Sequence, residues 1–483
     1  MRGLSTAIAL VATLAAPAST AASTTGQTQA DTFGQLYVDA VNSDAGFERF
    51  MLRDAESVPR EAIRGFFNDQ RWINGGGVDL IGARTRPGNP RLIEVAVRNR
   101  IYGGVQGVEL TLEAGDHPRI TAFEPTPAPA WALPRAKPQS QAEFADRASA
   151  LVDKGCAAGL FSGAVLIAAG DRVLVEKACG EASRRYHVAN TTSTRFNIGS
   201  MDKMFTVVAA MQLVEGGKLS PGATLDRYLD ASWLAPEIAR RVTVWQLMTH
   251  TSGLVPDVAD ELETKPRFRL RELDQFKPLV RDSRLATTPG ATFNYSNTGM
   301  LLLGAVIAQA SGEDYYAYVQ RHIFAPAGMT ATASDLIDDP VENLAIGYTR
   351  APGSAYGWRE NSIRIMRRGI PAGGGFSTVG DLHRFALALQ SEKLISAASL
   401  RRLWADEDRD NYAAGFEIGH GAVGPSAGHS GLDAGVSTRM RLYLDRGYVV
   451  VLLANIDRAA PPLLDAIEGE MVRAPVEKLG VAR

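Results

Sequence analysis

The sequence predicts an α+β protein in two unequal parts, each with its own antiparallel sheet. In the shorter part, helical apolar spacing is followed by strands that alternate apolar and polar residues. In the longer part, strand patterns near residues 161–178 and 440–454 enclose a mostly helical middle. Early and late strands around helices indicate a mixed antiparallel sheet flanked by helices.

The first residues have the pattern of a secretory signal peptide. Arg2 precedes an apolar stretch, residues 4–15, and small residues follow. We therefore expect residues 1–22 to be removed and the protein to be periplasmic or secreted. No cysteine lies near the expected cleavage region, which argues against a lipoprotein anchor, and the other apolar runs are too short to span a membrane.

Residues 30–125 predict a small α+β domain. Helical spacing covers residues 33–41, 47–53 and 60–68, and alternation then predicts strands at 78–82, 91–97, 108–112 and 120–123. This order of elements faintly resembles the NTF2-like (SnoaL-like) fold, a cone of helices on a curved sheet. No catalytic constellation stands out in it, so we expect a packing or substrate-positioning module.

A proline-rich segment, residues 126–140, predicts an extended linker. The larger domain, residues 141–476, is expected to begin with a helix at 141–154. A hairpin should follow, with strands at 161–169 and 172–178 and a Gly170-Asp171 turn.

Composition excludes several function classes. With 51 basic and 53 acidic residues the net charge is −2, so no global field attracts nucleic acid or anionic lipid. The 7 histidines show no metal-binding spacing, no phosphate-binding glycine loop occurs, and no metal or cofactor is expected. Whether the two cysteines, Cys156 and Cys179, form a disulfide is left open.

Three short motifs carry the chemistry: Ser200-Met201-Asp202-Lys203, Tyr295-Ser296-Asn297 and His429-Ser430-Gly431. A serine hydroxyl needs a base within hydrogen-bond reach. If Ser200 opens a helix, Lys203 lies one turn away on the same face. A desolvated lysine, or a tyrosinate held by one, can take the serine proton, because burial and positive charge shift both pKa values toward neutrality.

The residues that follow the first motif support its assignment to a catalytic site. Residues 204–214 are apolar almost all round, as in a buried helix, and a buried helix led by serine and lysine is unusual. Asp202 is expected to be a solvated or locally paired side chain, and His250 to have a structural role.

A competing motif lies at Gly424-Pro425-Ser426-Ala427-Gly428, which fits the G-x-S-x-G nucleophile elbow. That motif needs a strand, a sharp turn and a helix. The residues after it, 436–453, alternate and predict strands instead, so this alternative is disfavoured.

Longer matches support the three motifs. Over residues 142–475 the chain resembles the serine β-lactamase-related family, in the branch of class C β-lactamases, D-alanyl-D-alanine carboxypeptidases and esterases. The matching segments are residues 194–200, 247–254, 289–297, 326–329, 374–378 and 428–431. The resemblance implies a β-lactamase/transpeptidase-like sheet beside an all-α lobe, with the active site in the cleft between them.

The resemblance also implies the roles of the site residues. Ser200 would be the acylated nucleophile, Lys203 and Tyr295 would share acid and base work, and Asn297 would bind the substrate carbonyl side. His429, Ser430, Gly431 and Leu432 would flank the substrate on an edge strand, and the backbone N–H groups of Ser200 and Leu432 would form the oxyanion hole.

His429 departs from the lysine of the β-lactamases. With an ordinary pKa of about 6.5, it would lose its charge between pH 6 and 8. We therefore expect a serine hydrolase of the esterase or D-amino-acid peptidase type, acting on a small ester, amide or peptide. The alternatives are a β-lactamase and, from another class, a non-catalytic penicillin- or peptidoglycan-binding protein.

Overall fold

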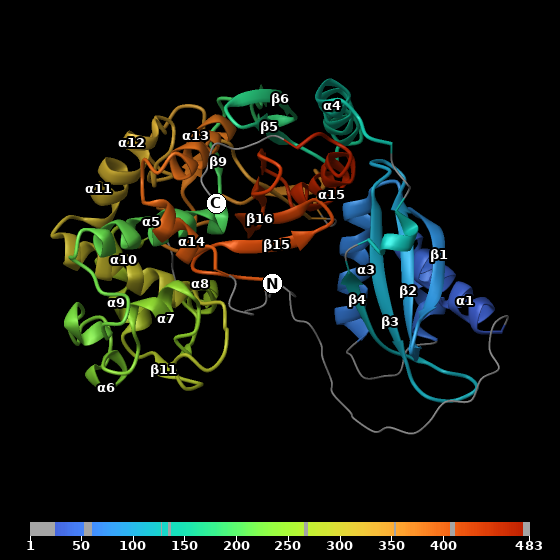
Figure 1. The fold of residues 1–483 in the computed structure, drawn as a ribbon, viewed down its shortest axis with the longest axis horizontal. Coiled ribbons are helices and arrows are strands. Elements are labelled where there is room, and N and C mark those ends of the chain that lie inside the picture. The colour runs from blue at the N-terminus through green and yellow to red at the C-terminus, as the bar shows by residue number, and fades with distance from the viewer. Residues whose placement is uncertain are drawn as a thin grey trace. The chain divides into compact units, whose positions relative to one another are not determined.

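The computed structural model describes residues 25–52, 60–126, 128–133, 137–264, 269–351, 354–405 and 411–476, and the predicted signal peptide lies outside them (Figure 1). Contacts divide the chain into two compact units. The smaller comprises Met1–Pro138, Asp153–Leu160 and Asp465–Arg473, and the larger comprises Gln139–Val152, Phe161–Leu464 and Ala474–Arg483. The first division falls within the proline-rich segment.

The smaller unit has three helices followed by a four-stranded antiparallel meander in the order β1-β2-β3-β4. Alternation buries one face of the sheet, where an aromatic cluster of Phe47, Phe50, Phe67 and Phe123 packs edge-on. The elements are α1 (Thr25–Asn42), α2 (Asp44–Met51), α3 (Arg60–Asn74), β1 (Val78–Arg86), β2 (Asn89–Asn99), β3 (Val105–Leu112) and β4 (Ile120–Thr126).

The larger unit is built on a six-stranded sheet in the order β15-β16-β17-β18-β5-β6, with every neighbouring pair antiparallel. β5 and β18 are buried along their whole length because helices cover them on both faces. The strands are β5 (Gly163–Ala169), β6 (Arg172–Cys179), β15 (Glu417–Gly421), β16 (Gly424–Asp433), β17 (Val436–Tyr443) and β18 (Tyr448–Ala454).

Helices flank this sheet and form a lobe beside it (Figure 1). The helices are α4 (Gln141–Ala157), α5 (Asp202–Glu215), α6 (Pro236–Ala239), α7 (Val244–Met248), α8 (Val258–Thr264), α9 (Lys277–Val280), α10 (Asn297–Ser311), α11 (Tyr315–Val319), α12 (Ala325–Ala327), α13 (Val379–Gln390), α14 (Ala397–Leu403) and α15 (Ala460–Met471). Short strands complete the unit: β7 (Glu181–Ser183), β8 (Val188–Ala189), β9 (Phe196–Asn197), β10 (Leu254–Val255), β11 (Arg284–Leu285), β12 (Tyr348–Arg350), β13 (Trp358–Glu360) and β14 (Phe376–Ser377). The predicted fold class is confirmed.

Two buried helices carry the first two motifs into the centre of the unit. α5 is apolar almost all round and buried on nearly every side, as predicted, and α10 is buried over its first ten residues after Asn297. The side chain of Ser296 caps α10 by accepting a hydrogen bond from Gly299 N at 3.0 Å. Each motif therefore lies at the N-terminus of a helix that packing holds rigid.

The nucleophile-elbow alternative is wrong. Ser426 is the third residue of the ten-residue strand β16, is 5% exposed, and is followed by more strand rather than by a turn and helix. Among the described helices, none is long and apolar enough to cross a membrane.

Candidate active site

Ser200 lies on a one-turn 3-10 helix, Gly199–Met201, immediately before α5. Asn197 shapes this turn by accepting a hydrogen bond from Gly199 N at 2.9 Å. Gly199 has a φ of 54°, and a Cβ there would lie 2.8 Å from Gly431 Cα. Glycine is therefore needed for both the conformation and the close approach, and the turn packs directly against the third motif.

Lys203 is fully buried and its Nζ has three partners. It lies 3.1 Å from Ser200 Oγ and 2.8 Å from Asn297 Oδ1, and it also donates to the carbonyl of Ala372. The amide and carbonyl oxygens can only accept. A neutral amine, with two N–H bonds and one lone pair, satisfies all three when its lone pair faces the hydroxyl of Ser200. In this arrangement a neutral Lys203 can accept the proton of the Ser200 hydroxyl.

Burial supports the neutral form. Desolvation lowers the pKa of Lys203 to about 7, although the carboxylates of Asp257, Asp202 and Glu417 oppose the shift. Asp202 is not solvated: it is 4% exposed and accepts a hydrogen bond from Gly375 N at 2.6 Å. Burial raises the pKa of Asp202 to about 7, so the two neighbours titrate as a coupled pair.

Tyr295 is hydrogen-bonded to the Ser200 hydroxyl and lies beside Lys203. Its ring centroid lies 4.7 Å from Lys203 Nζ. The pKa of Tyr295 is raised by burial, against a smaller lowering by its hydrogen bond with Ser200, although 37% of the residue is exposed. The expected shift toward neutrality is therefore found for Lys203 and not for Tyr295. Tyr295 keeps its proton, which suits a proton donor or relay better than the primary base.

Asn297 is held with both ends of its amide engaged. Nδ2 donates to Asp257 Oδ1 at 3.0 Å while Oδ1 accepts from Lys203. Asp257 also accepts from the backbone N–H of Asn297 at 2.6 Å. Asp257 thus orients Asn297, and Asn297 in turn holds Lys203. The contact of Asn297 with substrate stays a prediction.

The third motif lies on the C-terminal part of strand β16, which forms an edge of the sheet. β15 pairs with β16 only up to Gly428, so nothing in the described sheet pairs with residues 429–433 on that side. Ser430 N points away from β17, because it donates to Glu417 Oε1 at 3.0 Å. The N–H of Leu432, two residues on, points the same way and close to Gly199.

His429 is uncharged at neutral pH. It is 1% exposed, and burial lowers the pKa of His429 to about 4 despite the nearby Glu417. The expected loss of charge between pH 6 and 8 is therefore wrong for this histidine, because desolvation outweighs the carboxylate. An effect in that range would have to come from Lys203 and Asp202.

A buried hydrogen-bond chain joins the second and third motifs. Ser296 N donates to His250 Nδ1 at 3.0 Å, and His250 Nε2 lies 3.1 Å from the hydroxyl of Tyr412. That hydroxyl lies 2.8 Å from His429 Nε2, and His429 Nδ1 lies 2.7 Å from the carbonyl of Ser430. The backbone donor at one end leaves Nδ1 of His250 unprotonated, so His250 is neutral and carries its proton on Nε2. At the other end, the carbonyl accepts the Nδ1 proton of His429, and Tyr412 can donate to Nε2 of the neutral His429.

This chain packs behind the Tyr295 ring, whose centroid lies 4.5 Å from that of His250 and 5.8 Å from that of Tyr412. Replacing Tyr412 with phenylalanine keeps the ring but leaves two buried imidazole nitrogens without a partner. We expect the free energy of unfolding to fall by about 1–3 kcal/mol, measured by urea titration. Tyr228→Phe, which removes an exposed hydrogen bond, should cost clearly less. Equal small losses would contradict the chain.

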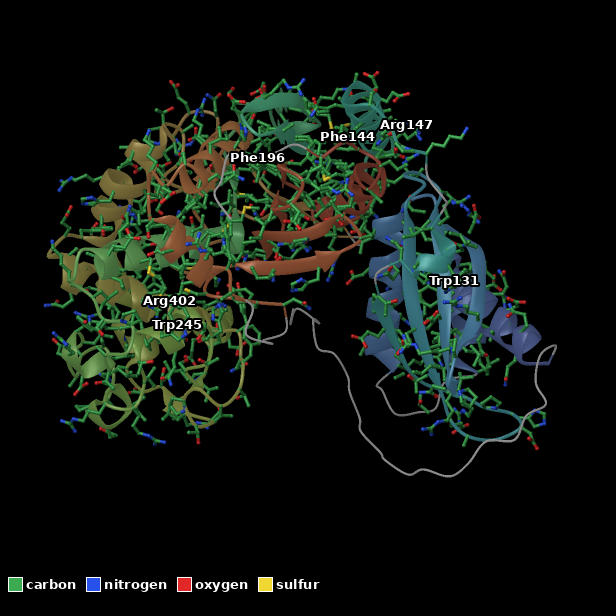
Figure 2. The ribbon with its side chains drawn as sticks, viewed as in Figure 1. Trp131, Phe144, Arg147, Phe196, Trp245 and Arg402 are labelled. Atoms are coloured by element: carbon green, nitrogen blue, oxygen red, sulfur yellow. The ribbon has the colours of Figure 1, made fainter. Side chains whose placement is uncertain are left out.

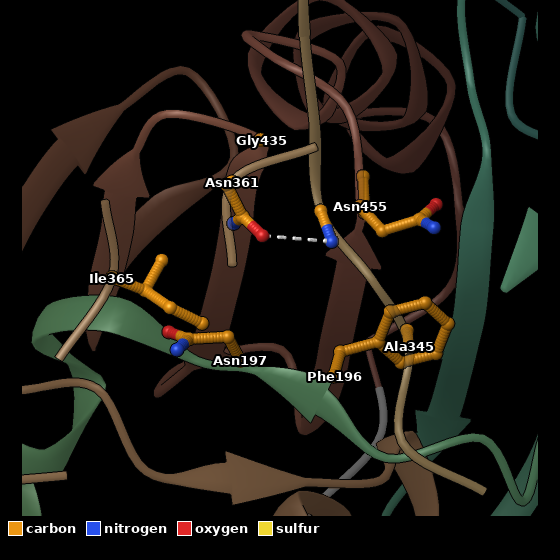
Figure 3. A pocket seen from close by; sticks show the side chains of 9 residues that line it. Phe196, Asn197, Ala345, Asn361, Ile365, Gly435 and Asn455 are labelled. Carbon is orange, nitrogen blue, oxygen red and sulfur yellow. Dashed lines mark hydrogen bonds between the residues drawn. The ribbon is translucent and has the colours of Figure 1, made fainter. Parts of the chain in front are cut away.

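Asparagines also hold the turns around the site (Figure 3). Asn197, Asn361 and Asn455 line a small pocket that includes none of the catalytic candidates. Asn361 donates to Ala434 O at 2.8 Å and accepts from Gly347 N at 3.1 Å, which fixes the turn after Leu432. Phe196 is buried. In the helical lobe, where Figure 2 labels both residues, the guanidinium carbon of Arg402 lies 4.5 Å from the centroid of the Trp245 ring.

Several site residues are not evident from the sequence: Asp257, Ala372, Tyr412 and Glu417. None belongs to a spaced motif of its own, and only the folded chain brings them to the three motifs. The described residues contain no cluster of His, Cys, Asp and Glu that could hold a metal ion.

Comparison with known proteins agrees with this geometry. The beta-lactamase family model matches residues 144–469, and the chain therefore belongs to that family. Penicillin-binding protein 4* of Bacillus subtilis (strain 168) is 28% identical over 313 residues, covering 61% of this chain and 68% of that protein.

Solved structures show the same fold. A penicillin binding protein from Bacillus halodurans has a TM-score of 0.59 and 32% identity, covering 64% of this chain and 95% of that one. D-amino acid amidase from Ochrobactrum anthropi SV3 has a TM-score of 0.57 and 20% identity, covering 68% and 98%, which is a likeness of fold. The family match begins at residue 144, so the NTF2-like resemblance rests on element order alone.

Proposed function

We propose that this protein is a serine hydrolase that forms an acyl-enzyme on Ser200 and acts on an ester or amide. The observation that carries the proposal is the buried Lys203, whose Nζ lies 3.1 Å from Ser200 Oγ with its other partners both acceptors. The three contacts would hold a charged lysine equally well, so they do not by themselves require the neutral form. Because the pKa of Lys203 is lowered to about 7, a neutral amine that can act as the general base is available near neutral pH.

In this mechanism, Lys203 takes the proton of Ser200 as the oxygen attacks the substrate carbonyl carbon. The N–H groups of Ser200 and Leu432 receive the developing negative charge. The bond to the leaving group then breaks, with a proton returned to that group through Tyr295. Water releases the acyl group by the reverse sequence. The intact constellation argues against the non-catalytic binding protein, which would not need all three groups.

An esterase or D-amino-acid peptidase is favoured over a β-lactamase. Penicillins and cephalosporins carry a carboxylate, and the neutral His429 offers it no charge where β-lactamases have a lysine.

We also propose that the protein is located outside the cytoplasm. Besides the signal-peptide pattern, both Cys156 and Cys179 are disulfide-bonded, which is typical of oxidising compartments.

The pH dependence tests the base. Only neutral Lys203 can accept the proton, and its pKa is lowered to about 7. We therefore expect kcat/KM for a neutral ester to rise with pH and level off above about 7 to 8. Asp202→Asn should shift the midpoint downward, because it removes a carboxylate that stabilises the charged lysine. A profile that is flat between pH 5 and 9 would contradict the proposal.

A further inference from the structure

A carboxylate lies against the third motif on the edge strand. Glu417, the first residue of β15, pairs opposite Gly428. Its Oε1 accepts the backbone N–H of Ser430 at 3.0 Å and also the hydroxyl of the same residue. Both donors that Ser430 could offer to a substrate are thus occupied by one oxygen of the protein.

The Glu417 carboxylate is ionised, and its ion pair with Arg441 leaves part of the side chain exposed. Its Oε2 lies 2.7 Å from Arg441 Nη2, and its side chain is 24% exposed. Burial alone would raise the pKa of Glu417, but the guanidinium of Arg441, with Arg439 and the hydrogen bond from the Ser430 hydroxyl, lowers the pKa well below its usual range. The third motif therefore presents an anion at neutral pH.

This charge lies close to the reacting groups. Glu417 Oε1 is 3.6 Å from His429 Nδ1, and the His429 ring centroid is 6.4 Å from that of Tyr295. Gly431, the next residue after Ser430, packs on the turn that holds Ser200. The edge of β16 beside the Ser200 turn therefore carries the carboxylate of Glu417.

We propose that Glu417 determines specificity: by occupying the donors of Ser430 with a negative charge, it excludes substrates with a free carboxylate on the leaving group and selects neutral esters and amides. This inference rests on the proposed function and narrows its substrate class: among peptidase-type reactions, it excludes those that release an amino acid with a free carboxylate and keeps neutral esters and amides. A substrate carboxylate would meet a like charge and find no free hydroxyl or N–H at Ser430, whereas a neutral leaving group meets neither penalty.

Two arginines carry the opposite charge nearby. Arg441 is committed to Glu417, and Arg439, which faces Ser430 across the β16–β17 ladder, has interactions of its own. If either one recruited a substrate carboxylate, acidic substrates would be preferred, and the test below would show it.

The experiment compares 4-nitrophenyl acetate with 3-carboxy-4-nitrophenyl acetate at pH 8. The acyl group is the same and only the charge of the leaving group differs. Each kcat/KM is divided by the rate of that ester with hydroxide. The full chain is assayed alongside Glu417→Gln, Glu417→Asp and, as a matched control, Glu313→Gln, whose carboxylate pairs with Arg321 on the surface.

We expect the wild type to prefer the neutral ester by about tenfold or more, and Glu417→Gln to reduce that ratio by about tenfold. Glu417→Asp and Glu313→Gln should keep the preference. If Glu417 has a purely structural role, its substitution changes both rates together and leaves their ratio unchanged, and this result would overturn the inference. A wild-type preference for the acidic ester would also overturn it.

Labelling of Ser200 by a fluorophosphonate separates the failure of this inference from the failure of the proposed function. If Ser200 is labelled but the ratio does not depend on Glu417, only this inference fails. If Ser200 is not labelled and neither ester is turned over, the proposed function fails with it.

Discussion

Replacing Ser200 with alanine is expected to lower kcat for an activated ester by at least about 10³-fold, because no other hydroxyl lies within reach of Lys203 Nζ among the partners that the structure describes. The substitution removes one hydroxyl from a half-buried side chain and should leave the fold intact. Steady-state kinetics with 4-nitrophenyl acetate measure the loss.

Ser426→Ala is the matched control, since Ser426 lies inside β16 and belongs to the rejected elbow motif. It should keep the wild-type rate within a few-fold. Strong loss in Ser426→Ala together with activity in Ser200→Ala would reverse the assignment.

Replacing Lys203 with methionine is expected to lower kcat by about 10²- to 10⁴-fold, because the serine loses its proton acceptor. Methionine fills a similar volume, so it avoids a large cavity in a position that is fully buried. The pH dependence near 7 should disappear with the lysine. Lys218→Met, at an exposed position after α5, serves as the control and should behave like the wild type.

Tyr295→Phe should also slow the reaction, but adding it to Lys203→Met should cost much less than the two single losses combined, because the groups act on one proton path. Full additivity would mean that the two side chains work independently, which the shared contact with Ser200 does not allow.

The sequence was sufficient for the parts of this site that local spacing controls. Ser200 and Lys203 are three residues apart, so one helical turn brings them together, and the apolar run after them predicts the buried α5. The helices and strands of the smaller unit follow in the same way from apolar periodicity. Most observed elements extend beyond their predicted ranges, whereas α2 (Asp44–Met51) begins and ends earlier than predicted.

The electrostatics of the site could not be predicted from spacing. His429 and Tyr295 were expected to titrate near neutrality, but desolvation moves their pKa values away from it, and burial depth depends on the whole fold. The pairing of β15 with β16 brings Glu417 to the site. Tyr412 joins the site through its hydrogen bonds with the side chains of His250 and His429. No pattern along the sequence links these positions.

The central claim is a covalent acyl-enzyme on Ser200. The most direct measurement is to treat the purified full-length protein with a fluorophosphonate and, separately, with benzylpenicillin, and to locate each adduct by peptide mass spectrometry. We expect the fluorophosphonate on the peptide that contains Ser200, with little or slow labelling by the penicillin because of its carboxylate, and no adduct in Ser200→Ala. An adduct on Ser426 or on any other serine, with Ser200 unmodified, would contradict the account.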